Sequence, residues 1–94
     1  MTISIKVGLV IVVAKAPLRA LADVTLQFVE GEITIRRCAV FEKPGVPPWA
    51  SLPRLPIEKN GKRHFVSLLD LPHELKQRVL DAVLDEYRRK IDAR

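Results

Sequence analysis

The residues best suited to chemistry in this chain are two histidines and one cysteine, His64, His73 and Cys38. Two histidines could bind a metal ion or act as an acid and a base, but these two fit neither a Glu-x-x-His nor a His-x-x-x-His spacing. Cys38 alternates with Val40, which is typical of a small buried residue rather than of a nucleophile. The four glycines are isolated and form no phosphate-binding loop. The sequence therefore predicts a protein that is not an enzyme, with no catalytic residue, metal, cofactor or small-molecule substrate.

Positive charge is the remaining chemical feature, and most of it precedes residue 70. Residues 1–69 hold ten Lys and Arg against five acids, whereas residues 70–94 hold six against six. The cations form three clusters: Arg36 and Arg37; Arg54, Lys59, Lys62 and Arg63; Arg88, Arg89 and Lys90. Such residues can neutralise nucleic-acid phosphates. They can equally be solvated side chains that keep strand edges from aggregating, and charge alone leaves both interpretations open.

Length and composition predict one globular domain over residues 1–94, because 48% of the residues are hydrophobic and 29% are charged. A single cysteine excludes an intramolecular disulfide and a multi-cysteine zinc site, which fits a cytoplasmic protein. The apolar run at residues 7–14 is too short to span a bilayer. It could belong to a signal peptide, but the period of two over residues 3–14 favours a strand, and no membrane association is expected.

The same alternation predicts strands at residues 21–29 and 32–41, joined by a hairpin turn around Glu30 and Gly31. Arg36 and Arg37 interrupt the second of these strands, because a regular strand would turn one of them toward the core. Either a bulge shifts the register there or one arginine lies on an open sheet face.

The next segment is rich in proline. Residues 42–49 are expected to form a turn or loop. Residues 49–57 can be only an edge strand, placed at about 49–55, or an irregular segment, since Pro53 and Pro56 lack ladder donors. Asn60 and Gly61 are the strongest hairpin signal in the chain, because both tolerate positive φ. They predict a return strand over residues 62–69.

The period changes near residue 70, where Asp70, Pro72 and Glu74 are typical of a helix start. The fold class is therefore α+β, with an antiparallel sheet of four to five strands followed by one long amphipathic helix over residues 72–91. Its apolar residues cover roughly 180° of the helix, more than one buried face needs. A homodimer is the simplest second contact, and the residues predicted at its interface are Leu80, Leu84, Tyr87 and Ile91.

The order of these elements resembles the stage V sporulation protein G family, the septation regulators of bacteria. The likeness covers roughly residues 20–88. Residues 22–28 match an alanine-led strand with a Thr-Leu core, residues 51–54 a Met-Pro-Ser-like element, Leu71 and Pro72 a turn, and residues 82–87 the end of the helix. Three features differ from the family pattern. They are the segment after the first hairpin, the two prolines before Trp49, and Leu71, which stands where the family has histidine.

The resemblance implies a dimeric regulator that binds DNA or RNA. On this chain the expected nucleic-acid contacts are then the cations after Leu52 and Pro53, which are Arg54, Lys59, Lys62 and Arg63, and the cations at the helix end, which are Arg88, Arg89 and Lys90. Arg36 and Arg37 are a third possibility. The alternative function is a dimeric protein-interaction module that captures a partner strand at the edge near Trp49 and does not bind nucleic acid.

Overall fold

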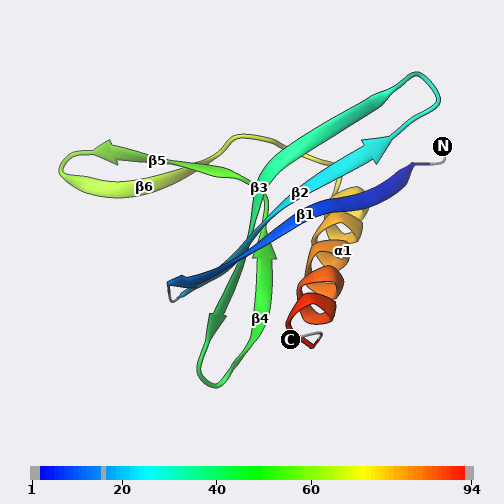
Figure 1. The fold of residues 1–94 in the computed structure, drawn as a ribbon. Coiled ribbons are helices and arrows are strands. Elements are labelled where there is room, and N and C mark those ends of the chain that lie inside the picture. Colours follow the sequence, from blue (N-terminus) through cyan, green and yellow to red (C-terminus); the bar gives the residue numbers. More distant parts are fainter. Residues whose placement is uncertain (1–2, 16, 93–94) are drawn as a thin grey trace.

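Six strands precede one helix in the computed structural model, which describes residues 3–15 and 17–92 and confirms the α+β class (Figure 1). The predicted helix is confirmed with nearly the expected bounds, as α1 (His73–Asp92). The strands are β1 (Ser4–Lys15), β2 (Leu18–Gln27), β3 (Glu32–Lys43), β4 (Val46–Ser51), β5 (Arg54–Lys59) and β6 (Lys62–Ser67).

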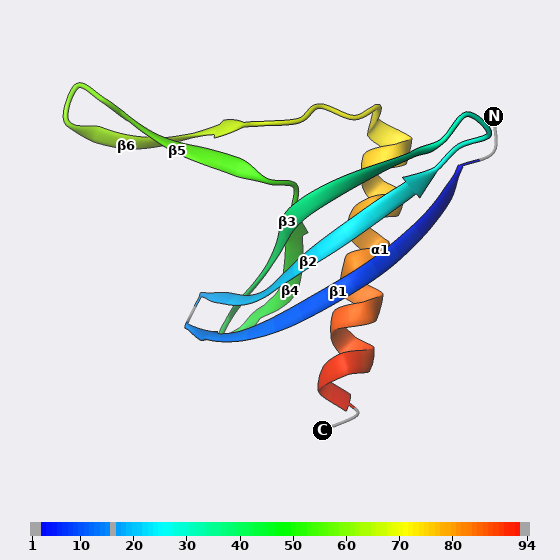
Figure 2. The same ribbon diagram turned by 45° about the horizontal axis from the view of Figure 1, so that its top comes forward.

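The first four strands form one antiparallel sheet in the order β1-β2-β3-β4, so each strand pairs with its neighbour in the chain. The helix α1 packs along one face of this sheet and leaves the other face without a covering element among the described residues (Figure 2). We call the uncovered side the open face.

The core lies between α1 and the sheet. Strand β2 contributes Ala20, Ala22, Val24 and Leu26, all at most 2% exposed, while the intervening residues point to the open face. The helix contributes Val79, Val83 and Tyr87, which recur at four-residue steps and are at most 4% exposed. One face of each element is thus buried, as the sequence periodicity predicts.

The two predicted hairpin turns are confirmed. Phe28 and Gly31 exchange backbone hydrogen bonds between β2 and β3. Between β5 and β6, Asn60 and Gly61 have φ values of 55° and 75°, and Lys59 pairs with Lys62 across the turn. Two successive positive φ values match the right-handed twist of the flanking strands, which explains why this dipeptide fixes the register of the second hairpin.

The proline-rich segment differs from the prediction of a loop followed by one strand at residues 49–55. Pro44 and Gly45 alone make the turn after β3, and Val46–Ser51 pairs with β3 as the edge strand β4. Leu52 and Pro53 then separate β4 from β5, so the structure has six strands instead of five. Pro47 and Pro48 fit β4 because it is an edge strand and because they lie at a register shift, between the pairs Phe41–Trp49 and Lys43–Val46, where the ladder is interrupted.

The β5–β6 hairpin projects from the rest of the molecule. Neither strand contacts β1 to β4 or α1, and every residue of both strands is exposed (Figure 1). The radius of gyration is 14.3 Å, larger than the roughly 12 Å expected of a compact domain of this length. At the base of the hairpin, the Leu68 amide donates a hydrogen bond to the Pro53 carbonyl at 3.2 Å and so joins the two ends of the hairpin to each other.

Candidate nucleic-acid interface

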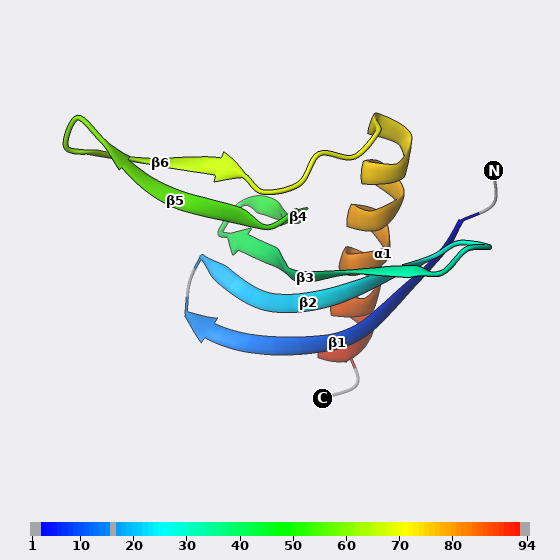
Figure 3. The same ribbon diagram turned by 90° about the horizontal axis from the view of Figure 1, so that it is seen from above.

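A groove of about 840 Å³ lies between the open face and the base of the β5–β6 hairpin. Strands β2, β3 and β4 form its floor, and the base of the hairpin forms its wall. The hairpin extends away from α1 (Figure 3). Four cations line it: Arg36, Arg37, Lys43 and Arg54. No carboxylate is among its described lining residues, so the groove favours an anionic ligand.

A β-bulge decides which side chains of β3 reach this groove. Asp23 of β2 stands opposite both Arg36 and Arg37, since Ala22 pairs with Cys38 and Val24 with Ile35. Of the two alternatives that the sequence left open, the bulge is the one observed, and both arginines are exposed. After the bulge, Cys38 and Val40 face the helix while Arg37, Ala39, Phe41 and Lys43 share the open face.

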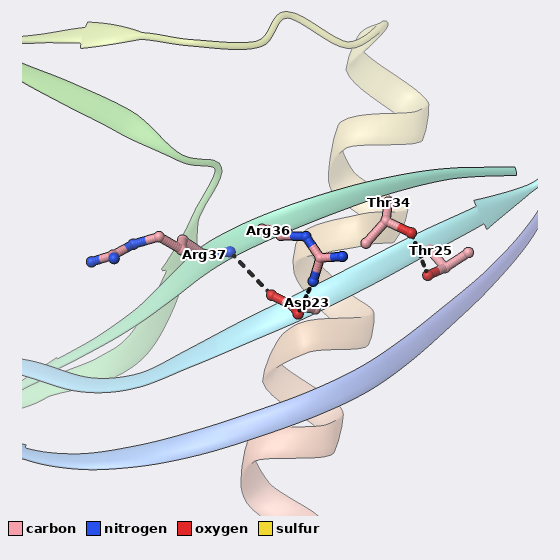
Figure 4. A network of polar contacts seen from close by, with 5 residues as sticks. All are labelled: Asp23, Thr25, Thr34, Arg36 and Arg37. Carbon is pink, nitrogen blue, oxygen red and sulfur yellow. Dashed lines mark hydrogen bonds and ion pairs between the residues drawn. The ribbon is translucent and has the colours of Figure 1, made fainter.

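Asp23 holds the bulge together. Its carboxylate accepts a hydrogen bond from Arg36 Nη1 at 2.9 Å and another from the Arg37 backbone amide at 3.4 Å (Figure 4). Arg36 is therefore partly neutralised. The Arg37 side chain points away from Asp23 and makes no hydrogen bond or ion pair with any other described residue. Arg37 is the arginine of this pair that is free to bind an anion.

Arg37 has a φ of 65°, a conformation that is unfavourable for residues with a Cβ atom. We expect Arg37→Gly to exceed Arg37→Ala in free energy of unfolding by about 1 kcal/mol, because glycine adopts this φ without a steric penalty. Denaturant titration of both variants measures the difference. Both lose the guanidinium, so both should bind an anionic ligand more weakly than the wild type. Equal stabilities would mean that the positive φ is not retained in solution.

Aromatic rings form part of the groove lining. Phe41 and Trp49 are cross-strand partners in β3 and β4, and their rings stack with centroids 5.6 Å apart at an interplanar angle of 24°. On the hairpin, the Arg54 guanidinium lies 5.2 Å from the centroid of the Phe65 ring, within cation–π range. Trp49 is 36% exposed and Phe65 is 56% exposed, so both rings keep surface available for a ligand.

The structure divides the predicted nucleic-acid contacts into two sets. Arg36, Arg37 and Arg54 line the groove. Lys59, Lys62 and Arg63 are exposed at the tip of the β5–β6 hairpin, whose base carries Arg54. Arg88, Arg89 and Lys90 lie in the last turns of α1, far from the hairpin (Figure 1). Two of these helix-end arginines meet carboxylates one turn away: Arg88 lies 3.8 Å from Asp85, and Arg89 lies 3.0 Å from Glu86.

The residues predicted at a dimer interface occupy different environments. Tyr87 is 4% exposed and packs within the core of its own protomer, where its hydroxyl lies 3.4 Å from Glu42 Oε2. Leu80 and Leu84 are half-buried and pack against the same core, whereas Ile91 is 37% exposed. Intramolecular packing therefore accounts for much of the wide apolar arc of the helix.

Cys38 is buried in the sheet. Burial raises the pKa of its thiol from 9.0 to about 11, and the nearby charge of Asp23 acts in the same direction. A raised pKa keeps the thiol protonated at neutral pH, and the thiolate is the reactive form. We expect native protein to react with an aromatic disulfide reagent at pH 8 far more slowly than denatured protein. A native rate equal to that of a free thiol would contradict the burial of Cys38.

The two histidines are exposed, His64 on β6 and His73 at the start of α1. Within residues 3–15 and 17–92, no group of three or more His, Cys, Asp or Glu side chains is arranged to hold a metal ion. Over the same part of the chain, no helix is both long and apolar enough to cross a membrane.

Comparison with known proteins returned no match to this chain, whether against family models, curated proteins or solved structures. The resemblance to the septation regulators therefore stays a prediction that rests on the sequence segments that carry it.

Sequence patterns did not identify Phe41, Lys43, Trp49 and Phe65 as a group. They come from three strands, and only the strand pairing brings them together. A weak signal was available within β3, because a bulge at Arg36 and Arg37 places Arg37, Phe41 and Lys43 on one face. The pairing of Phe41 with Trp49 depends on the short turn at Pro44 and Gly45, where a longer loop was expected.

Proposed function

We propose that this protein binds DNA or RNA without catalysing a reaction, and that the groove and the adjoining hairpin contact the phosphates. The observation that carries the proposal is the composition of the groove, whose described lining residues include four cations and no carboxylate. Phosphate contacts of this kind provide affinity that depends little on sequence. The helix α1 packs on the other face of the sheet, so sequence reading by a helix at the groove is not part of the proposal.

A homodimer is the second part of the proposal. An isolated two-stranded hairpin is marginally stable in water, yet β5–β6 contacts no other strand or helix. One of its faces carries Leu55, Ile57 and Val66, which are 37% to 48% exposed, with Lys59 and Lys62 at the tip. The other face carries Arg54, Glu58, Arg63 and Phe65. A second copy that covers Leu55, Ile57 and Val66 would stabilise the hairpin and leave the other face and the two tip lysines accessible.

Sedimentation velocity tests the dimer. We expect the wild type to sediment as a dimer and Ile57→Asp to shift the equilibrium toward monomer, because the new carboxylate would have to be buried against an apolar surface. Val29→Asp is the matched control, since Val29 is 97% exposed in the β2–β3 turn. A wild type that is monomeric at micromolar concentration would remove the dimer from the proposal without affecting the groove.

Binding itself is tested by fluorescence anisotropy of labelled DNA and RNA across a salt series. The logarithm of the binding constant should fall steeply and linearly with the logarithm of the salt concentration. Replacing Lys59, Lys62 and Arg63 by Gln together should weaken binding to all sequences alike and make this slope shallower, by up to about three if each cation contacts a phosphate. Absence of binding at low salt by well-folded protein would contradict the proposal.

The resemblance to the bacterial septation regulators agrees with this proposal and would make the protein a cytoplasmic regulator. The alternative of strand capture at β4 has less support, because β4 contains Pro47 and Pro48, and proline has no backbone donor for a partner strand.

A further inference from the structure

We infer that the groove accepts the unpaired bases of a single-stranded nucleic acid, with Trp49 as the main stacking platform. This inference rests on the proposed function and names its ligand more closely. Cations alone would serve a duplex equally well, whereas the apolar and aromatic part of the lining favours unpaired bases.

The first observation is that aromatic and cationic side chains line the same groove. The stacked pair Phe41 and Trp49 lies on the floor, and Phe65 lies on the hairpin wall. Arg54 sits against Phe65, and Lys43 follows Phe41 by two residues on the same face of β3. Proteins that bind single strands combine these two groups, because bases stack on aromatic rings while the backbone phosphates meet cations.

The second observation is that two of the rings are exposed. Trp49, the single tryptophan of the chain, is 36% exposed, and Phe65 is 56% exposed. Exposed aromatic surface that gathers in one groove is typical of a ligand-binding site. A duplex keeps its bases stacked on one another, so it cannot offer their flat faces to these rings.

The third observation concerns the ligand's charge. Arg37 has no ion-pair partner among the described residues, and it occupies a backbone conformation that glycine would adopt more easily. A cation retained at such a position beside an apolar floor fits a ligand that is anionic along its backbone and apolar on its ring faces. Nucleotides linked in a strand have both properties.

Trp49 provides a direct reporter of the site, because a base stacked on its ring quenches indole fluorescence. We expect oligothymidylate of about 20 nucleotides to quench this emission, because it is longer than the site that one small single-strand-binding domain covers. A duplex of equal length should quench little and bind at least about tenfold more weakly, because it cannot stack on the rings.

Trp49→Ala should lower single-strand affinity by about five- to hundredfold, as measured by anisotropy, and leave duplex affinity unchanged. Val46→Ala is the matched control, since Val46 is an exposed residue of the same strand that does not line the groove. Phe65→Ala is a second variant on the hairpin, which keeps the test valid if Trp49→Ala does not fold. Circular dichroism and thermal unfolding verify the fold of each variant.

Several results would overturn the inference. Equal affinity for single strand and duplex, with no effect of Trp49→Ala or Phe65→Ala, would leave the phosphate-binding function standing and remove the stacking site. Binding of polyglutamate as tightly as oligothymidylate would instead point to an acidic protein partner. Failure to bind either nucleic acid at low salt would contradict the proposed function as well.

Discussion

Replacing Arg37 and Arg54 together by Gln should weaken nucleic-acid binding by about a hundredfold at low salt, the largest effect on binding that we expect from two substitutions. A charge-assisted hydrogen bond is worth about 1.5–3 kcal/mol, so two lost contacts correspond to at least two orders of magnitude. The two arginines line opposite sides of one groove, Arg37 on the sheet and Arg54 on the hairpin. A bound strand would contact both.

The matched control for this pair is Lys6→Gln with Lys76→Gln, which removes the same net charge from exposed positions outside the groove. It should lower affinity only slightly, through the general field of the protein. The salt slope should fall by about two for the arginine pair and change little for the lysine pair. Equal losses for both pairs would show that net charge, and not the groove, determines binding.

Leu26→Ala should produce the largest loss of stability, about 3 kcal/mol in free energy of unfolding. Leu26 is 2% exposed and is among the largest fully buried side chains, so its removal leaves a cavity between β2 and the core. For a domain of this size the loss corresponds to a fall in melting temperature on the order of 15 °C.

Val29→Ala is the control for Leu26→Ala, because Val29 lies three residues further along and is 97% exposed. Its effect on the free energy of unfolding should be within about 0.5 kcal/mol. Urea titration and calorimetry measure both variants. A loss below about 1 kcal/mol for Leu26→Ala would contradict its placement in a well-packed core.

Local sequence patterns were sufficient for most of the fold. Asn60 and Gly61 specify their turn through backbone conformation alone, and the four-residue steps of Val79, Val83 and Tyr87 specify the buried side of α1. The edge strand β4 was not predictable in the same way. Its prolines are unfavourable for a strand in general, and its position at the edge of the sheet and the register shift at these prolines make them acceptable.

The candidate site was less predictable because it depends on pairing between strands. The sequence identified Arg36, Arg37 and Arg54 as candidate contacts but gave no reason to group them with Phe41 or Trp49. Their proximity follows from the bulge opposite Asp23 and from the register that pairs Phe41 with Trp49. Arg88 and Arg89, which the family resemblance also makes candidate contacts, lie beside Asp85 and Glu86 on the helix.

The most direct test of the central claim is to map the binding surface by nuclear magnetic resonance. Backbone amide and tryptophan indole signals of labelled protein would be followed during titration with unlabelled oligothymidylate. We predict that the signals of Arg37, Phe41, Lys43, Arg54 and the Trp49 indole shift together, while those of residues 88–90 do not. Shifts confined to the helix end, or no shifts at low salt, would contradict the assignment of this groove as the nucleic-acid interface.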